Sequence, residues 1–330
     1  MTKFKAFRTK EIDGKFISEI EQISFDELPD NDVIIEVVFS GINYKDLLSS
    51  QGNKGITKEY PHTPGIDASG YVVSDKSGLF KTGDEVVVLG YDMGMNTDGG
   101  FAEYICVPAQ WVLPKPSTFT LKQCMQIGTS GFTAGLGIAK MLLLGLQPNQ
   151  GPVLVSGATG GVGVYAVQIL SALGFEVYAS TNKQESKNLL TTLGAKDILS
   201  REEIMIPKEK AMTKPRFAAG LDTVGGDTLV SMLKQTIKSG SVATCGNVAG
   251  FKLEMTVFPF ILNGINLLGI NAADTPMANR KEVWKLLERF AKPDLVAQAC
   301  TEIGLEGIND ALANMANSTH TGRFLVNTKV

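Results

Sequence analysis

Histidine and cysteine are scarce in this chain of 330 residues. The two histidines, His62 and His320, lie far apart in the sequence, and none of the four cysteines forms a C-x-x-C pair with another. Because zinc sites are commonly built from closely spaced cysteine and histidine ligands, these two residue types show no spacing that indicates a zinc site. Scattered cysteines of this kind are typical of reduced thiols in a cytosolic protein, so we expect the protein to be cytoplasmic.

Strong net charge and long apolar runs are also lacking. The formal net charge is -3, which creates no field that would attract nucleic acid or an anionic membrane. The segment Met1–Lys10 is polar and basic and contains no apolar core of a signal peptide. The apolar stretch Ile138–Leu146 is too short to span a bilayer, and polar residues interrupt Met255–Ile270. We therefore expect neither nucleic acid nor a membrane as a partner.

Short strands are predicted over the first third of the chain. Runs of β-branched and aromatic residues alternate there with turn signals such as Asp13-Gly14 and Gly83-Asp84. The predicted strands are Lys3–Arg8, Phe16–Ile23, Val33–Phe39, Tyr71–Val73, Glu85–Leu89 and Tyr104–Val107. Many short, closely spaced strands indicate a barrel or a sandwich.

Strands and helices alternate from Pro152 onward, after a mostly apolar helical stretch at Leu121–Leu144. The predicted strands are Val153–Ser156, Val177–Ser180, Ala195–Leu199, Ala219–Asp222, Ser241–Cys245 and Leu267–Asn271. The predicted helices are Val162–Leu173, Glu185–Leu193, Thr228–Ile237, Glu282–Phe290 and Ile308–Asn317. This alternation predicts an α/β fold with a doubly wound parallel sheet. A closing strand at Phe324–Thr328 could return to the N-terminal β region and make that region discontinuous.

A glycine-rich loop follows the first strand of the alternating region and opens a helix. The dinucleotide-binding pattern G-x-G-x-x-G covers Ala158 to Gly163, with Ala158 in the place of the first glycine. Gly160 would let the backbone approach a pyrophosphate, and Gly163 would let the helix pack on the sheet. The helix start at Gly160, Gly161, Val162 and Gly163 would offer free N–H groups to the phosphates. A purely structural turn is the alternative interpretation.

The second strand of this region predicts which dinucleotide is bound. It ends at Ser180 and is followed by Thr181, Asn182 and Lys183. NAD-specific sites usually carry an acid here that holds the ribose 2′-hydroxyl. Without that acid a 2′-phosphate is not repelled, and Lys183 or Arg201 can pair with it. The sequence therefore favours NADPH, although both cations could also be solvated surface residues.

With these motifs in view, the chain resembles the medium-chain dehydrogenase/reductase superfamily over essentially its full length. The resemblance is carried by Gly41-Ile42-Asn43-Tyr44-Lys45-Asp46, Pro64-Gly65-Ile66-Asp67-Ala68-Ser69-Gly70, Gly83-Asp84-Glu85-Val86, Gly99-Gly100-Phe101-Ala102-Glu103-Tyr104 and the glycine loop. Within the superfamily the chain is similar to the acryloyl-CoA reductase and quinone oxidoreductase group of YhdH and YhfP type. The segments that carry this narrower resemblance are Ile127–Ala134, Asp222–Gly225, Phe258–Leu262 and Thr321–Arg323.

The resemblance implies two domains. One is a GroES-like β domain made of residues 1–122 and 298–330. The other is a Rossmann dinucleotide-binding domain made of residues 123–297.

The resemblance also implies a member that works without zinc. The zinc alcohol dehydrogenases of the superfamily place a Cys where Asn43 stands, a His where Ile66 stands and a Cys at about Thr129. Alcohol oxidation on this fold relies on the metal to polarise the oxygen. A metal-free member suits an electrophile that is already activated, such as an enoyl thioester, an enone or a quinone.

The expected reaction is hydride transfer from NADPH to the β-carbon of a short enoyl thioester such as acryloyl-CoA, followed by protonation at the α-carbon. By resemblance Tyr44 lies at the nicotinamide, and its phenol can donate a hydrogen bond or a proton. Asn43 could add a polar contact to the substrate or the cofactor, whereas Asp46 is expected to hold the loop. Tyr44 could instead border the site without a chemical role.

Further cofactor contacts are expected by resemblance alone. These residues are Thr129, Thr133, Asn247, Ile261, Asn271 and Ala272. Core packing would explain Ile261 equally well. His62 and His320 are expected to be structural or surface residues. As an alternative, His320 lies near the segment Thr321–Arg323 and could reach the cofactor.

Two other functions stay open from the sequence. An NADPH-dependent quinone reductase needs no metal either. A catalytically silent nucleotide-binding regulatory or RNA-binding protein could keep the fold, although the acidic balance argues against it. The strand Leu267–Asn271 is apolar, and in relatives the corresponding edge strand pairs across a two-fold axis, so the resemblance implies a homodimer.

Overall fold

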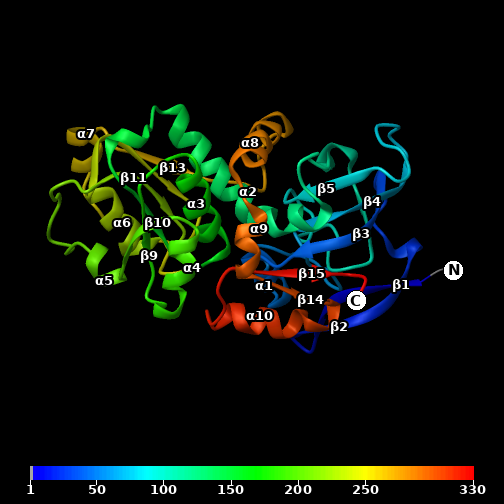
Figure 1. Ribbon diagram of the computed structural model, residues 1–330. Coiled ribbons are helices and arrows are strands. Elements are labelled where there is room, and N and C mark those ends of the chain that lie inside the picture. The colour runs from blue at the N-terminus through cyan, green and yellow to red at the C-terminus, as the bar shows by residue number, and fades with distance from the viewer. Residues whose placement is uncertain (1–2) are drawn as a thin grey trace. The chain divides into compact units, whose positions relative to one another are not determined.

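The computed structural model describes residues 3–330, which form two compact units (Figure 1). Unit 1 contains the chain up to Thr129 together with Ala273–Arg280 and Cys300–Val330. Unit 2 contains Ser130–Ala272 and Lys281–Ala299. Compared with the predicted domains, the first boundary lies later in the chain, and unit 1 gains the segment Ala273–Arg280.

Unit 1 is built mainly from antiparallel strands. They are β1 (Lys3–Ile12), β2 (Lys15–Ser24), β3 (Val33–Gly41), β4 (Asp67–Asp75), β5 (Glu85–Leu89), β6 (Tyr104–Val107), β7 (Leu113–Pro114), β14 (Cys300–Ile303) and β15 (Arg323–Asn327). Its helices are α1 (Tyr44–Ser50) and α10 (Ile308–Ala316). Strands β1 and β2 form a hairpin, and the others form a sheet in the order β14-β15-β3-β4-β5-β7, with β6 paired to β3. The closing strand β15 pairs with β3, so the end of the chain returns to the N-terminal β region, the arrangement that the sequence left open.

The core of unit 1 follows from the alternation in its strands. In β3 the side chains of Val33, Ile35 and Val37 are buried, whereas the residues between them are only partly covered. The buried set packs against Val72, Val86 and other apolar residues of β4–β6. A second cluster lies around Phe7, Phe101 and Phe324 and includes the inner face of α10.

Unit 2 is a doubly wound α/β unit. Its strands are β8 (Val153–Ser156), β9 (Val177–Ser180), β10 (Ala195–Leu199), β11 (Phe217–Asp222), β12 (Thr236–Thr244) and β13 (Asn266–Gly269). Its helices are α3 (Gly161–Ala172), α4 (Lys187–Thr192), α5 (Arg201–Ile204), α6 (Gly226–Lys234), α7 (Phe258–Asn263) and α9 (Pro293–Val296). The helices α2 (Leu121–Leu143) and α8 (Met277–Phe290) begin in unit 1 and end in unit 2.

All strand pairs of the second sheet are parallel, in the order β10-β9-β8-β11-β12-β13. The strand order reverses between β8 and β11. Ligands of such sheets bind at this switch point, beyond the carboxyl ends of the strands. The architecture therefore directs attention to the loops that follow β8, β9, β11 and β12.

Some predicted elements differ from the structure. The helix predicted at Thr228–Ile237 is α6, which begins at Gly226 and ends at Lys234, because β12 already starts at Thr236. The strand predicted to reach Asn271 is β13, which ends at Gly269. Helix α1 was not predicted, since seven residues are too few to show a helical period. Among residues 3–330, no helix combines the length and the apolar character needed to cross a membrane.

Candidate active site

The loop between β8 and α3 has the geometry of a phosphate-binding turn. Gly160 is the N-cap of α3, with extended backbone angles of φ -79° and ψ 167°. The N–H groups of Gly161, Val162 and Gly163 lie in the first turn, where no helical carbonyl precedes them. Together with the positive end of the helix dipole, they favour an anion.

Glycine is required at two positions of this loop. Gly157 adopts a left-handed φ of 58°, and a Cβ there would collide with Thr223. A Cβ at Gly163 would collide with the backbone of Gly157 and Ala158, so the close helix–strand approach predicted for Gly163 is present. The tight-turn position, which the sequence pattern gave to Ala158, belongs to Gly157. At Gly160 an added Cβ would meet only the Gly157 carbonyl oxygen, at 3.4 Å, which leaves space in front of the loop.

The residues predicted to select the dinucleotide come together at the ends of β9 and β10. The Arg201 N–H donates to Asn182 Oδ1 at 2.8 Å, which joins the loop after β9 to the start of α5. The Lys183 N–H donates to Thr181 Oγ1 at 3.1 Å. Burial lowers the pKa of the Lys183 ammonium, against the raising effect of Glu185. Ser180 is buried, and the segment Ser180–Lys183 contains no carboxylate.

A buried carboxylate, Asp222, organises the switch point and was not predicted as a site residue. Its Oδ1 accepts a hydrogen bond from Ser156 Oγ at 2.7 Å, and its Oδ2 accepts one from Thr244 Oγ1 at 2.9 Å. The N–H groups of Val224 and Gly225 also donate to it. Asp222 therefore fixes the ends of β8, β11 and β12 relative to one another.

In unit 1, helix α1 presents the predicted catalytic segment. Tyr44 is the first residue of the helix and is 50% exposed. Asn43, just before it, is buried and donates from Nδ2 to the Gly41 carbonyl at 3.1 Å and to Asp67 Oδ2 at 2.9 Å. Asp46 is fully buried and accepts hydrogen bonds from the N–H groups of Asn43, Gly65 and Ile66. Burial raises the pKa of Asp46 to about 7, although these hydrogen bonds lower it.

A second buried carboxylate, Asp67, lies beside Asn43 at the start of β4. Arg323 donates from Nη2 to Asp67 Oδ2 at 2.9 Å and from Nη1 to the Ile127 carbonyl at 2.8 Å. Thr129 donates to Asp67 from its N–H at 3.0 Å and from Oγ1 at 2.5 Å. Gly128, which kinks α2 with a φ of 47°, leaves no room for a side chain against this pair. We call Asn43, Asp67, Thr129 and Arg323 the Asp67 cluster.

The Asp67 cluster does not fit a catalytic zinc ion. The three positions that the family resemblance matches to the zinc ligands of the alcohol dehydrogenases hold an amide at Asn43, a hydrocarbon at Ile66 and a hydroxyl at Thr129. The Asp67 carboxylate is already paired with the guanidinium of Arg323, a cation that would repel a metal ion, and the Asp46 carboxylate is occupied by three backbone N–H groups. In the part of the chain that the structure describes, no three Cys, His, Asp or Glu side chains gather into a metal site.

The other predicted cofactor residues belong to several elements of unit 2. Thr133 is buried within α2, and Asn247 lies in the exposed loop after β12. A hydrogen bond from the Ala249 N–H to the Val224 carbonyl connects this loop to the turn after β11. Asn271 and Ala272 follow β13 without belonging to it. Ile261 lies on α7 and is 68% exposed, so the core-packing alternative for it is wrong.

The two histidines each contact a neighbouring side chain of unit 1. His62 is buried, with Nδ1 3.3 Å from Asp98 Oδ1. His320 packs its ring against Phe324.

Comparison with known proteins assigns each unit to a family. Residues 29–117 match the alcohol dehydrogenase GroES-like domain, and residues 161–291 match the family described as zinc-binding dehydrogenase. Over 326 residues the chain is 40% identical to YhfP of Bacillus subtilis, which covers 98% of this chain and 99% of that protein. The chain belongs to the medium-chain dehydrogenase/reductase family. It is therefore an oxidoreductase of this family, in the group of YhfP, AcuI and YhdH.

Two crystal structures and one further relative show how similar this chain is to members of the group. The crystal structure of YhfP with NAD bound has a TM-score of 0.96 to this chain and covers 99% of it and 100% of that chain. The YhdH oxidoreductase of Salmonella enterica in complex with NADP has a TM-score of 0.95 at 36% identity and covers 98% of this chain and 99% of its own. The acrylyl-CoA reductase AcuI of Ruegeria pomeroyi is 37% identical over 313 residues, 95% of both chains. The family resemblance and the GroES-like and Rossmann folds predicted from the sequence are thus confirmed.

Proposed function

We propose that this protein is an NADPH-dependent reductase of an activated carbon–carbon double bond, with acryloyl-CoA or a similar short enoyl thioester as its substrate and without zinc. The Asp67 cluster carries this proposal, because it places an amide, a hydroxyl and an ion pair where zinc dehydrogenases hold their metal. A site without a Lewis acid suits a substrate that is already electrophilic. The name of the relative AcuI supports an acryloyl thioester.

The bound cofactor would supply a hydride to the β-carbon of the substrate. The electron pair of the double bond then moves onto the thioester as an enolate, which takes a proton at its α-carbon. Tyr44 is the side chain best placed to donate a hydrogen bond to the enolate oxygen or the proton itself, because it is exposed at the start of α1. Asn43, whose Nδ2 is committed to Gly41 and Asp67, would position α1 rather than touch the substrate.

In unit 2 the glycine loop at Gly160–Gly163 would hold the pyrophosphate, and Arg201 and Lys183 would pair with a 2′-phosphate. The lack of a carboxylate after β9 supports NADPH over NADH, as does the complex of YhdH with NADP. YhfP was crystallised with NAD, so NADH is the cofactor to compare. A higher catalytic efficiency with NADH than with NADPH would overturn this preference.

Quinone reduction is the second candidate function. It is supported by the name of YhfP, which ascribes a quinone oxidoreductase activity to that protein, and it needs no metal. The decisive experiment measures NADPH consumption with acryloyl-CoA and with a benzoquinone, separately and in competition. Fast, saturable turnover of acryloyl-CoA with slow quinone reduction supports the enoyl-thioester reductase. Turnover of the quinone alone moves the assignment to a quinone reductase. NADPH binding without turnover of either would favour the nucleotide-binding regulatory alternative.

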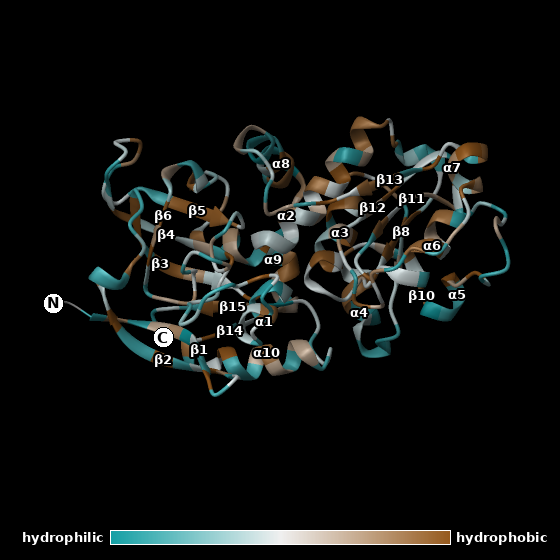
Figure 2. Ribbon diagram, turned by 180° about the vertical axis from the view of Figure 1, so that it is seen from behind, coloured by the Kyte–Doolittle hydropathy of each residue, from teal (hydrophilic) through white to brown (hydrophobic). Residues whose placement is uncertain are grey.

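The apolar surface next to β13 supports a homodimer. Strand β13 lies at one end of the parallel sheet, and helix α7 beside it in the sequence is largely apolar (Figure 2). Four side chains of this segment are strongly exposed, namely Val257, Phe258, Ile261 and Leu262. Edge strands with exposed apolar neighbours are usually covered by a partner. A second copy of the chain that pairs across a two-fold axis would cover β13 and the apolar surface of α7.

A further inference from the structure

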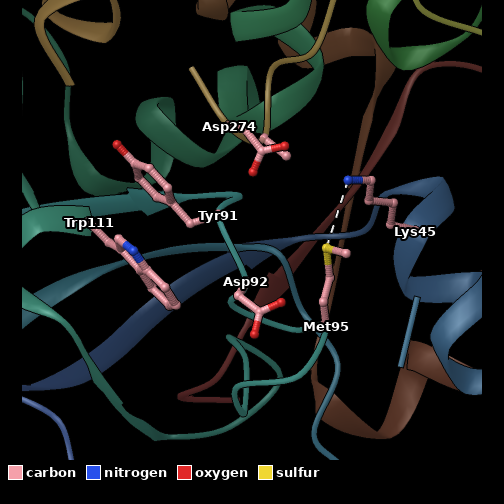
Figure 3. Close-up of a pocket in the computed structure, with 7 residues that line it drawn as sticks. Lys45, Tyr91, Asp92, Met95, Trp111 and Asp274 are labelled. Atoms are coloured by element: carbon pink, nitrogen blue, oxygen red, sulfur yellow. Dashed lines mark hydrogen bonds between the residues drawn. The ribbon is translucent and has the colours of Figure 1, made fainter. Parts of the chain in front are cut away.

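A pocket of about 240 Å³ opens within unit 1 beside α1 (Figure 3). It is lined by Lys45, Tyr91, Asp92, Met95, Trp111, Ala273 and Asp274. Pockets that enclose a whole drug-sized ligand measure roughly 300–1,000 Å³. This pocket therefore fits one segment of a ligand. One of its lining residues, Lys45, follows Tyr44, the proposed proton donor, in α1.

Charges of both signs face the pocket. The Lys45 ammonium lies 3.8 Å from Met95 Sδ, and no carboxylate within residues 3–330 comes close enough to form an ion pair with it. Asp92 and Asp274 also line the pocket, and Asp92 Oδ1 accepts a hydrogen bond from Asn96 Nδ2 at 2.8 Å. A phosphate group would meet two carboxylates there, and a cationic group would meet the Lys45 ammonium. A neutral group with both N–H donors and C=O acceptors can accept a hydrogen bond from the Lys45 ammonium and donate one to a carboxylate of the lining.

The remaining walls are apolar and held in place. The rings of Tyr91 and Trp111 stack with centroids 5.5 Å apart and planes 7° apart. The Arg280 guanidinium lies 4.1 Å from the Tyr91 ring centroid and donates to the carbonyls of Ala273 at 2.6 Å and Thr275 at 2.9 Å. The Tyr91 N–H donates to the Ala273 carbonyl at 2.9 Å. These contacts fix the aromatic wall and the backbone next to Asp274 before any ligand arrives.

We propose that this pocket binds the amide-bearing arm of a thioester substrate, an inference that rests on the proposed function. Lys45 donates to an amide carbonyl of the arm, and Asp92 or Asp274 accepts a hydrogen bond from an amide N–H. The methylene groups of the arm pack against Trp111 and Met95. The pantetheine portion of coenzyme A has this chemistry: it is uncharged, narrow, and alternates amides with methylene groups. The nucleotide phosphates of coenzyme A remain outside the pocket.

The first test compares substrates with and without the arm. The kcat/KM values are measured for acryloyl-CoA, acryloyl-pantetheine and methyl vinyl ketone, which lacks the arm, with the wild type and Lys45→Met. The variant is expected to lose about tenfold more efficiency on both thioesters than on the ketone, because one charge-assisted hydrogen bond is removed. The control is Lys81→Met, which makes the same charge change at an exposed lysine between β4 and β5. It should leave the ratio of thioester to ketone efficiency unaltered. Lys45→Arg, which keeps a cationic donor, should restore much of the thioester preference.

Two outcomes of this test would overturn the inference. An equal loss on all three substrates would show that Lys45 does not recognise the arm. A loss on acryloyl-CoA alone would place Lys45 at a phosphate instead.

The second test measures binding without turnover. The chain has two tryptophans, and Trp111 lies in the pocket wall whereas Trp284 is buried in unit 2. Pantetheine should quench the fluorescence saturably, Trp111→Phe should abolish the change, and Lys45→Met should weaken binding about tenfold. Reduction of acryloyl-CoA without pantetheine binding would overturn the pocket assignment and leave the proposed function intact. Pantetheine binding without reduction of any thioester would overturn the proposed function and leave the pocket assignment intact.

Discussion

Arg323 donates a hydrogen bond from Nη2 to Asp67 Oδ2 at 2.9 Å, across 256 positions of the sequence. Both side chains are buried. The same carboxylate accepts hydrogen bonds from Asn43 and Thr129, so it joins the closing strand β15 to the start of α1 and to the kink in α2. The pair therefore holds together the backbone that presents Tyr44.

Removing the cation of this pair should destabilise the protein strongly. Arg323→Met leaves Asp67 buried without its partner, which typically costs about 3–5 kcal/mol of the free energy of unfolding. Urea denaturation measures this loss. Lys329→Met provides the control, because its ion pair with Glu36 is partly exposed and should contribute less than about 1 kcal/mol. Equal effects of the two substitutions would contradict the structural role of the buried pair, and Asp67→Asn added to Arg323→Met should recover part of the loss.

The free energy of unfolding should carry a pH-dependent contribution from Asp46. Because the pKa of this carboxyl is raised from 3.8 to about 7 in the folded state, the folded protein favours its neutral form. The contribution is fully present below pH 3.8 and is lost as the pH rises through about 7. The stability of the wild type relative to Asp46→Asn should therefore fall over this window, by up to about 1.4 kcal/mol per pH unit. A difference between the two proteins that does not change with pH would refute this behaviour.

Tyr44→Phe should lower kcat for acryloyl-CoA by about 100-fold, which is typical of removing a general acid. Since Tyr44 is half exposed, the free energy of unfolding should change by less than about 0.5 kcal/mol. Tyr71→Phe, which removes an exposed phenol on β4, is the matched control and should turn over normally. Full turnover by Tyr44→Phe would exclude the phenol as proton donor.

The protein should be a homodimer in solution at micromolar concentration. Ile261→Glu places a charge on the exposed apolar surface of α7 and should shift the mass measured by light scattering toward the monomer. Leu79→Glu changes an equally exposed residue of unit 1 and should leave the dimer intact. A monomeric wild type would contradict the proposed homodimer.

Local signals explain which features could be predicted from the sequence. Strand β8 has its predicted bounds, Val153–Ser156, because a short apolar run ends there at a glycine. The glycine loop was predicted from its spacing, but the residue with a left-handed backbone is Gly157 and not Ala158. The spacing alone does not distinguish these two adjacent positions, because they differ in their backbone angles. The Arg323–Asp67 pair and the pocket around Lys45 were beyond prediction, because their members come from segments that only the folded sheet brings together.

The most direct test of the proposed reaction follows the hydride itself. Acryloyl-CoA is reduced with NADPH that carries deuterium at the transferable position of its nicotinamide, and the product is analysed by NMR and mass spectrometry. We predict propanoyl-CoA with one deuterium on the β-carbon and a hydrogen from solvent on the α-carbon. Deuterium on the α-carbon, or no propanoyl-CoA while a quinone is reduced by the same preparation, would contradict hydride transfer to an enoyl thioester.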